Sequence, residues 1–196
     1  MKRDFLVLED VELKGKKILV RVDINSSINP ETGEILDDTR IRRHAKKTIE
    51  YLSNEKAKIV IIAHQSRPGN LDFVSLEKHA ERMGEIIGRE IKFVPDICGS
   101  KAKKNIKKLK NSEILMLDNL RFHKDEIDVR DYNGENFEPQ ENTEMIKELA
   151  PEFDLFVNDA FATAHRCQPS IVGFSRTMPT IAGKVMENEI NQLNKA

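Results

Sequence analysis

Short apolar runs alternate along this chain with stretches that have the apolar spacing of amphipathic helices. The runs are rich in β-branched residues, too short for helices and bounded by turn-forming residues, which is typical of buried strands. They predict strands at Lys17–Val22, Lys58–Ala63, Ile91–Val94, Glu113–Leu117 and Leu155–Val157.

Between these runs, apolar residues recur every three or four positions, so each stretch buries one face of a helix. Asp38 and Ser75 are candidate N-caps of the first two helices, and Gly88 ends the second. The predicted helices carry the apolar stripes Ile41–Leu52, Leu76–Ile87, Ala102–Leu109 and Met145–Leu149, and a last helix covers Gly183–Asn194.

Alternation of continuous apolar strands with amphipathic helices predicts a single α/β fold class. We expect a three-layer α/β/α, Rossmann-like open parallel sheet with helices on both faces, joined by right-handed crossovers. Two segments interrupt the alternation. Asn29–Glu34 is predicted to be a turn or a small hairpin, and the polar segment Lys124–Gln140 a surface insertion.

Charge and composition narrow the class of protein. The 32 Lys and Arg against 33 Asp and Glu give a net charge of −1, which argues against a non-specific nucleic-acid binder. The absence of a long apolar run and of a signal-peptide pattern predicts a cytoplasmic protein with no membrane association. Cys98 and Cys167 are too few for a disulfide framework. The Lys-, Glu- and Ile-rich, Trp-free composition leans toward a thermophile.

Cations follow several predicted strands at the point where each strand ends. Because an open parallel sheet binds its ligand at the carboxyl ends of the strands, we expect these side chains to converge on one rim. Five arginines with two histidines would bind a small, phosphorylated, acidic molecule. The residues near these ends are Arg21, Asp23, Asn25, Arg40, His64, Arg67, Asn119, Arg121, Asn158, Asp159, His165 and Arg166.

Other features have simpler interpretations. The arginines taken one by one fit separate surface or ion-paired positions. The lysines of Lys101–Lys110 fit the solvated face of a helix, and His44, His79 and His123 fit surface or helix-flanking positions. These histidines have no paired metal-ligand spacing. No glycine-rich nucleotide motif follows the first strand, so side chains would bind the anion.

Several of these segments resemble the phosphoglycerate kinase family, in the order that the family has them. The matching segments are Arg21–Asn25 (RVDIN), Ala63–Gly69 (AHQSRPG), Leu117–Phe122 (LDNLRF), Val157–Arg166 (VNDAFATAHR) and Met178–Glu187 (MPTIAGKVME).

The resemblance implies reversible phosphoryl transfer between 1,3-bisphosphoglycerate and ADP, giving 3-phosphoglycerate and ATP, in glycolysis and gluconeogenesis. Residues 1–182 would form the N-terminal, substrate-binding domain, and residues 183–196 the start of the interdomain helix. The C-terminal domain, which binds Mg-ADP or Mg-ATP in the family, would be absent. Because catalysis then needs closure of two domains about a hinge, this chain would bind substrate without turnover.

Carried over by motif, substrate-binding residues surround the predicted rim. Arg40 would contact the transferring phosphoryl group and act in catalysis, and no metal is expected in this chain. The sequence departs from the family pattern at Ser26–Ser27, Ser66 and Ala162. The implied binding residues are Asp23, Ile24, Asn25, Arg40, His64, Gln65, Ser66, Arg67, Arg121 and Arg166, with Arg21 and His165 as further members.

Two other functions stay open. The chain fits a stand-alone binding or regulatory module for a phosphorylated acid, to which adding a nucleotide domain would restore nothing. A phosphoester hydrolase is disfavoured because Asp23 lacks the second aspartate of a D-x-D pair.

Overall fold

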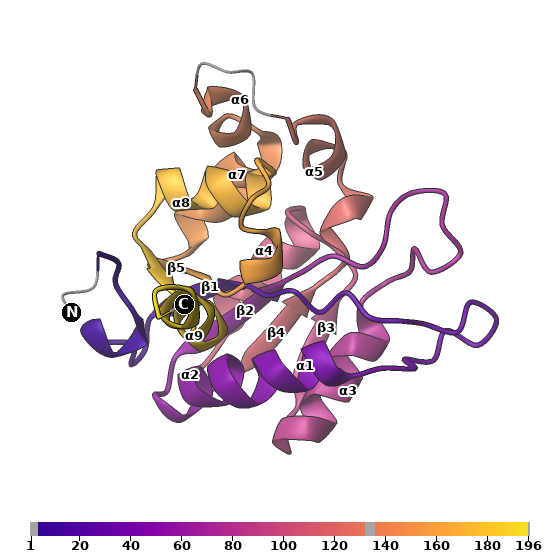
Figure 1. The fold of residues 1–196 in the computed structure, drawn as a ribbon, viewed down its shortest axis with the longest axis horizontal. Helices are drawn as coiled ribbons and strands as arrows, with labels where there is room; N and C mark the ends of the chain where they lie inside the picture. Colours follow the sequence, from indigo (N-terminus) through magenta and orange to yellow (C-terminus); the bar gives the residue numbers. More distant parts are fainter. Residues whose placement is uncertain (1–3, 132–135, 196) are drawn as a thin grey trace.

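Parallel strands form one sheet in the computed structural model, which describes residues 4–131 and 136–195 (Figure 1). Within these residues the strand order is β3-β4-β2-β1-β5-β6. The strands are β1 (Lys17–Arg21), β2 (Lys58–Ile62), β3 (Ile91–Val94), β4 (Ile114–Leu117), β5 (Leu155–Asn158) and β6 (Thr180–Ala182). The predicted strands are confirmed to within one residue, whereas β6 was not predicted.

β1 is one of the two central strands of the sheet and pairs with β2 on one side and β5 on the other. In this register Leu19 lies between Val60 and Phe156. The unpredicted strand β6 pairs with β5 at the sheet edge. On its outer side, Ala182 donates its backbone N–H to the carbonyl of Leu6 at 2.9 Å, so the N-terminal segment covers this edge.

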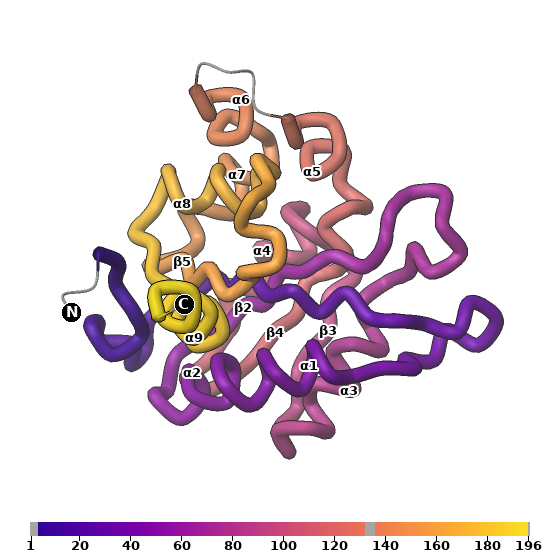
Figure 2. Tube along the Cα trace, in the orientation of Figure 1, coloured from indigo at the N-terminus to yellow at the C-terminus, as the bar shows by residue number. Residues whose placement is uncertain are grey.

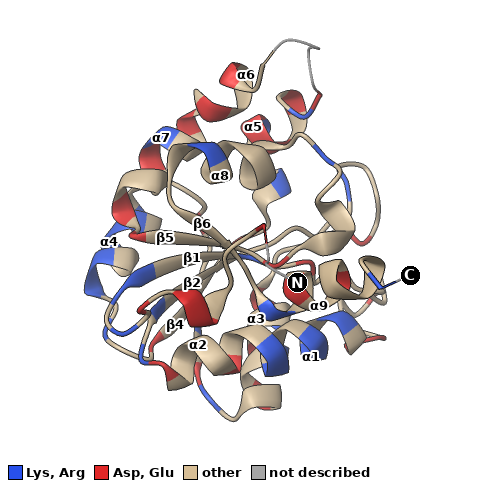
Figure 3. Cartoon of the chain, turned by 60° about the vertical axis from the view of Figure 1, so that its left-hand side comes forward, with Lys and Arg blue, Asp and Glu red and all other residues tan. Residues whose placement is uncertain are grey.

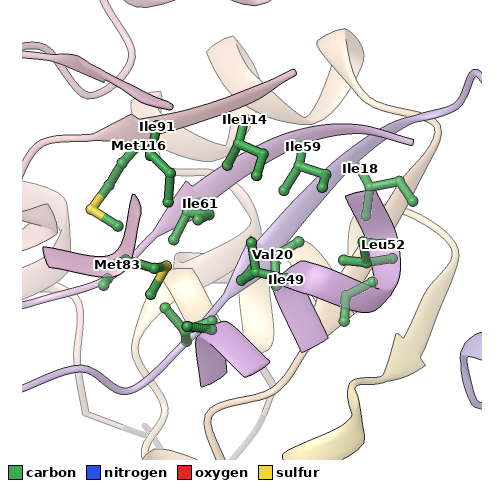
Figure 4. Packing of buried hydrophobic residues seen from close by; sticks show 14 of the residues in the cluster. Ile18, Val20, Ile49, Leu52, Ile59, Ile61, Met83, Ile91, Ile114 and Met116 are labelled. Atoms are coloured by element: carbon green, nitrogen blue, oxygen red, sulfur yellow. The ribbon is translucent and has the colours of Figure 1, made fainter. Parts of the chain in front are cut away.

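Alternate strand residues face two separate hydrophobic layers, as a parallel sheet covered on both sides requires. One layer joins Ile18, Val20 and Ile59 to residues such as Ile49 and Met83 (Figure 4). It contains α1 (Thr39–His44), the π-helical segment η2 (Ala45–Ile49), α2 (Glu50–Asn54) and α3 (Glu77–Ile87).

The opposite layer packs on Leu19, Val60 and Leu115, and its helices lie on the other side of the sheet in Figure 3. The predicted three-layer α/β/α arrangement is therefore confirmed. This layer contains α4 (Ser100–Lys108), α7 (Glu144–Leu149) and α8 (Phe174–Thr177), while the short α5 (Lys124–Asp128) and α6 (Glu138–Glu141) precede α7.

The last helix, α9 (Lys184–Leu193), packs beside α1 and the N-terminal segment (Figure 2). Its Lys184 forms an ion pair with Glu9. Among the described residues, none of the helices combines the length and apolar character that a membrane crossing needs.

Two predicted details of helix boundaries have different outcomes. Gly88 ends α3 in the left-handed conformation, with φ of 66°, as glycine allows. Asp38 precedes α1, but its carboxylate bonds Arg42 and Arg82 at 2.9 Å instead of a backbone N–H. Asp38 therefore occupies the predicted N-cap position of α1, but its side chain does not cap the helix because these guanidiniums bind it.

Two histidines that were expected at surface or helix-flanking positions are buried parts of helices. His44 is 4% exposed and bonds Asp159, and His79 is inaccessible and bonds Gln65. Burial lowers the pKa of His79 to about 4, so this imidazole is neutral at pH 7. The expectation was wrong because the polar faces of these helices meet partners from distant loops. His123 is half-buried and accepts the Asp125 N–H at the start of α5.

The two interruptions of the pattern form local structure. Ile28 and Ile35 make an antiparallel bridge, and Asn29 donates its N–H to the Glu34 carbonyl, so the predicted hairpin is confirmed. The Lys124–Gln140 segment, of which residues 132–135 lie outside the described structure, is not simply a surface insertion. Glu126 is inaccessible and Gln140 is nearly so.

The lysine-rich helix α4 has the solvated face that its pattern predicted. Ala102 and Ile106 are buried, whereas Lys104 and Lys108 are exposed. Lys103 and Lys107 pair with Glu148 and Glu152.

Candidate functional site

The carboxyl ends of β1, β2, β4 and β5 meet at one edge of the sheet. The chain leaves β1 and β2 toward helices of one layer and leaves β4 and β5 toward helices of the other. Such a divergence creates a crevice, which is where open α/β sheets bind ligands. The loops that follow these four strands carry most of the predicted site residues.

A cavity of about 360 Å³ lies at these loops. Arg67, Arg121, Arg130 and Arg166 line it together with His165. Because the lining includes only two acidic residues, the cavity is strongly positive and suits a planar anion such as a phosphate or carboxylate. The other lining residues are Pro68, Glu126, Ile127, Asp131, Cys167 and Gln168.

Two of these arginines have guanidinium groups that no described residue binds. Within the described part of the chain, the side chains of Arg67 and Arg166 make neither a hydrogen bond nor an ion pair. Arg121, in contrast, is nearly buried and donates from Nη1 to the carbonyl of Ser66. Burial and the neighbouring Arg166 lower the pKa of Arg121 to about 10, so it is still charged at pH 7. A bound anion would relieve this repulsion.

Arg21 lies beneath the cavity, not on an open rim as predicted. It is inaccessible to solvent, and its guanidinium donates to Ser170 Oγ at 3.1 Å and to the carbonyl of Val22. Ser170 in turn donates to the buried carboxylate of Glu126 at 2.6 Å. Desolvation lowers the pKa of Arg21, and the negative charge of Glu126 opposes that effect. Arg21 is therefore a buried residue that is linked through Ser170 to Glu126 in the cavity wall.

His64 is held by this buried arginine. Arg21 Nη2 lies 2.8 Å from His64 Nδ1, and because a guanidinium only donates, Nδ1 accepts and the imidazole proton is on Nε2. Burial, followed by the nearby charges of Arg21 and Arg121, holds the pKa of His64 far below its usual range. His64 is a neutral donor at physiological pH.

The loops after β1 and β2 bond each other directly. Ser66 donates its N–H to Asn25 Oδ1 at 2.7 Å, and Ser26 donates its N–H to Gln65 Oε1 at 2.9 Å. The side chain of Asn119 bonds both the N–H and the carbonyl of Gln65. Ile24 is inaccessible to solvent. In this state the Gln65 peptide is satisfied internally, so the expectation that the peptides around Ile24, Gln65 and Ser66 face a ligand stays a prediction.

Asp23 and Arg40 form an ion pair on the other side of the loop. Asp23 is nearly buried, whereas the Arg40 side chain is about half exposed. They line a second cavity of about 240 Å³ with Arg43, His44 and residues of α9. Arg40 is thus separate from the arginines of the larger cavity.

The sequence pattern missed Glu126 and Arg130. Both lie in the polar segment after Phe122, where acidic and basic residues carry no periodicity that distinguishes a buried or site-lining position from a solvated one. Among the described residues, no group of three or more His, Cys, Asp or Glu is arranged to hold a metal ion.

Comparisons of the sequence and the fold with known proteins identify the family to which the chain is similar. The family model described as phosphoglycerate kinase matches residues 8–196. The chain is 50% identical to the phosphoglycerate kinase of Methanothermobacter thermautotrophicus over 98% of its length and 45% of that protein, and 44% identical to that of Sulfurisphaera tokodaii over 96% and 44%.

Solved structures agree with this match. The crystal structure of phosphoglycerate kinase from Pyrococcus horikoshii superposes with a TM-score of 0.89 at 39% identity, covering 97% of this chain and 45% of that one. The structure from Coxiella burnetii gives 0.77 at 28% identity. The chain spans a little under half the length of these relatives. With the family model matching almost all of it, the chain belongs to the phosphoglycerate kinase family.

Proposed function

We propose that this chain is the N-terminal, 3-phosphoglycerate-binding half of a phosphoglycerate kinase. In this proposal residues 1–182 bind 3-phosphoglycerate or 1,3-bisphosphoglycerate, and residues 183–196 begin the helix to a nucleotide-binding domain. The observation that carries the proposal is the arginine-lined cavity at the carboxyl ends of the strands, in which the guanidiniums of Arg67 and Arg166 have no partner within residues 4–131 and 136–195.

Charge matching supports this ligand. A phosphate monoester with a carboxylate carries about −2.5 to −3 at pH 7, which several guanidiniums can meet with charge-assisted hydrogen bonds. We assign the 3-phosphate to Arg67, Arg121 and Arg166. His64 would donate from Nε2, and Asp23 with Asn25 would hold the hydroxyl and carboxylate end.

The chemistry makes modest demands on this half of the enzyme. The substrate carboxylate is ionised at neutral pH and is itself the nucleophile, so no general base is required. Positioning and charge neutralisation are then sufficient. Arg40, fixed by Asp23, would stabilise the transferring phosphoryl oxygens, and it should affect rate more than binding.

The nucleotide belongs to the other half of the enzyme in this proposal. Mg-ADP or Mg-ATP supplies or accepts the phosphoryl group when bound, and we assign it to a C-terminal domain that must close on this one. This chain alone should therefore bind 3-phosphoglycerate without turnover in a cytoplasmic setting.

Calorimetric titration of 3-phosphoglycerate at low salt tests the proposal. We expect Arg67→Ala and Arg166→Ala each to weaken binding at least tenfold. Arg89→Ala is the matched control, because Arg89 is exposed and precedes β3, at the opposite edge of the parallel sheet. Equal loss in Arg89→Ala would indicate non-specific ionic attraction, and failure of folded wild type to bind would contradict the proposal.

A second experiment separates an enzyme half from a stand-alone binding module. Mixing this chain with the nucleotide-binding half of a phosphoglycerate kinase should restore turnover if the chain is an enzyme half. Tight binding of 3-phosphoglycerate with no turnover in any such mixture would favour the module instead.

A further inference from the structure

The start of α9 is anchored by the buried carboxylate of Asp159. Asp159 Oδ1 accepts the N–H groups of Val185 at 2.8 Å and Met186 at 3.2 Å, and no part of Asp159 is accessible to solvent. A carboxylate in this place satisfies helix N–H groups that lack partners and matches the helix dipole. A Cβ on Gly183 would overlap Asp159, so the close approach requires glycine there.

The second oxygen of the same carboxylate binds His44. Oδ2 lies 2.7 Å from His44 Nδ1, and His44 Nε2 lies 3.4 Å from the backbone nitrogen of Asp23. A backbone N–H only donates, so Nε2 accepts and the imidazole proton lies on Nδ1, bonded to Asp159. His44 thus has one defined tautomer and uses both ring nitrogens.

Asp23 completes the connection by pairing with Arg40. A continuous chain of bonds therefore runs from the α9 N-terminus through Asp159, His44 and Asp23 to Arg40. Other contacts hold the same seam together. Arg43 pairs with Glu189, and Lys184 donates its N–H to Thr48 Oγ1 at 3.1 Å. The helix changes from α1 to the π-helical η2 directly after His44, and such segments occur frequently at functional sites.

We propose that His44 and Asp159 are positioning residues that set the Asp23–Arg40 pair according to the position of α9. Neither residue contacts the transferring group, so their effect reaches Arg40 only through Asp23. The catalytic meaning of this coupling rests on the proposed function, in which α9 leads to the nucleotide-binding domain and Arg40 contacts the phosphoryl group. The coupling itself is a property of this chain and is measurable without a ligand.

Nuclear magnetic resonance of the 196-residue chain tests the coupling. Gly183→Ala places a methyl group against Asp159 and should shift the resonances of the Asp23 amide and the Arg40 Nε–H group. His44→Asn retains a donor near the Nδ1 position but has no acceptor for the Asp23 N–H. In that background, Gly183→Ala should shift both resonances several-fold less. Equal shifts in the two backgrounds, or no shift in the wild-type background, would overturn the proposal.

A near-isosteric variant covers the case in which Gly183→Ala does not fold. Asp159→Asn keeps an acceptor for α9 if its Oδ1 faces the helix, and its amide then donates to His44 Nδ1. The His44 proton should move to Nε2, and the Asp23 N–H should lose its acceptor. We expect ring-nitrogen shifts of a protonated Nδ1 in the wild type and of a protonated Nε2 in Asp159→Asn, with altered Asp23 and Arg40 resonances. An unchanged tautomer, or unchanged Asp23 and Arg40 resonances, would contradict the proposal.

The two proposals fail in different ways. If 3-phosphoglycerate does not bind, the proposed function fails while the resonance shifts still report the coupling. If the ligand binds at Arg67 and Arg166 but the resonance test fails, the function stands and His44 is only a structural residue.

Discussion

Arg21 Nη2 donates to His64 Nδ1 at 2.8 Å, and both side chains are almost completely buried. This contact ties the ends of β1 and β2 together, and burial together with the Arg21 charge keeps His64 neutral. It also puts a guanidinium inside the protein, where the charge is tolerated because Ser170 links it to Glu126. The arginines that line the cavity therefore lie next to a buried charged layer, which consists of Arg21 and Glu126 joined by Ser170.

Removal of the Glu126 charge should test this layer. Glu126→Gln removes the stronger of the two negative charges that act on the buried Arg21 guanidinium, Glu126 and Asp23, and breaking a buried charge pair costs about 3–5 kcal/mol. We expect the free energy of unfolding to fall by about 3 kcal/mol in urea denaturation at pH 7. The exposed control Glu31→Gln should change it by less than about 0.5 kcal/mol. Similar values for the two variants would show that Glu126 does not stabilise Arg21.

Acid should destabilise the chain through His79. The folded pKa of His79 is lowered to about 4 by burial, from 6.5, and His79 Nδ1 has no hydrogen-bond partner among the described residues. Between pH 4 and pH 6.5 the unfolded chain therefore binds more protons than the folded chain. The resulting stability is complete above about pH 6.5 and decreases toward pH 4, by up to about 3 kcal/mol.

Urea denaturation at pH 7 and at pH 4.5 measures this effect. His79→Gln keeps a side-chain N–H donor but cannot titrate, so its loss of stability on acidification should be smaller than that of the wild type. The exposed His165→Gln variant serves as the control and should behave like the wild type. An identical loss in His79→Gln and wild type would mean that other groups cause the acid sensitivity.

Arg130 should strengthen the binding of an anionic ligand in the arginine-lined cavity. Its side chain is largely exposed and only 4.0 Å from Asp131, so its contribution is ionic and screened by salt. We expect Arg130→Gln to weaken 3-phosphoglycerate binding two- to fivefold at low salt and to reduce the salt dependence of the affinity. Calorimetry at two salt concentrations, with Arg89→Gln as the control, measures both. Unchanged affinity and salt dependence would exclude Arg130 from the site.

Ser66 has a backbone φ of 56°, in the left-handed region that favours glycine. Its hydroxyl bonds Asp72 and Asn70, and both Ser66→Gly and Ser66→Ala remove these bonds. Only glycine also removes the left-handed strain, which costs about 1–2 kcal/mol. Ser66→Gly should therefore be more stable than Ser66→Ala by about 1 kcal/mol in thermal or urea unfolding. The reverse order would show that φ at this position changes with the residue.

The amino-acid sequence by itself determined the layers and the location of the arginine-lined cavity. Apolar runs at Lys17–Val22 and Lys58–Ala63 and helical stripes such as Leu76–Ile87 are local patterns, and burial of one face follows directly from them. Because the strands are parallel, residues after them, including Arg67 and Arg166, had to gather at one edge. The family motifs lie at the same positions.

Only the tertiary structure decided which polar residues are inside. Thr180–Ala182 is a strand because β5 and the N-terminal segment lie on either side of it, and three residues between Pro179 and Gly183 carry no pattern of their own. Burial of Arg21, His44 and His79 depends on partners from remote segments, such as Ser170, Asp159 and Gln65. A charged or polar side chain is buried only where such partners satisfy it, and their proximity is a property of the whole fold.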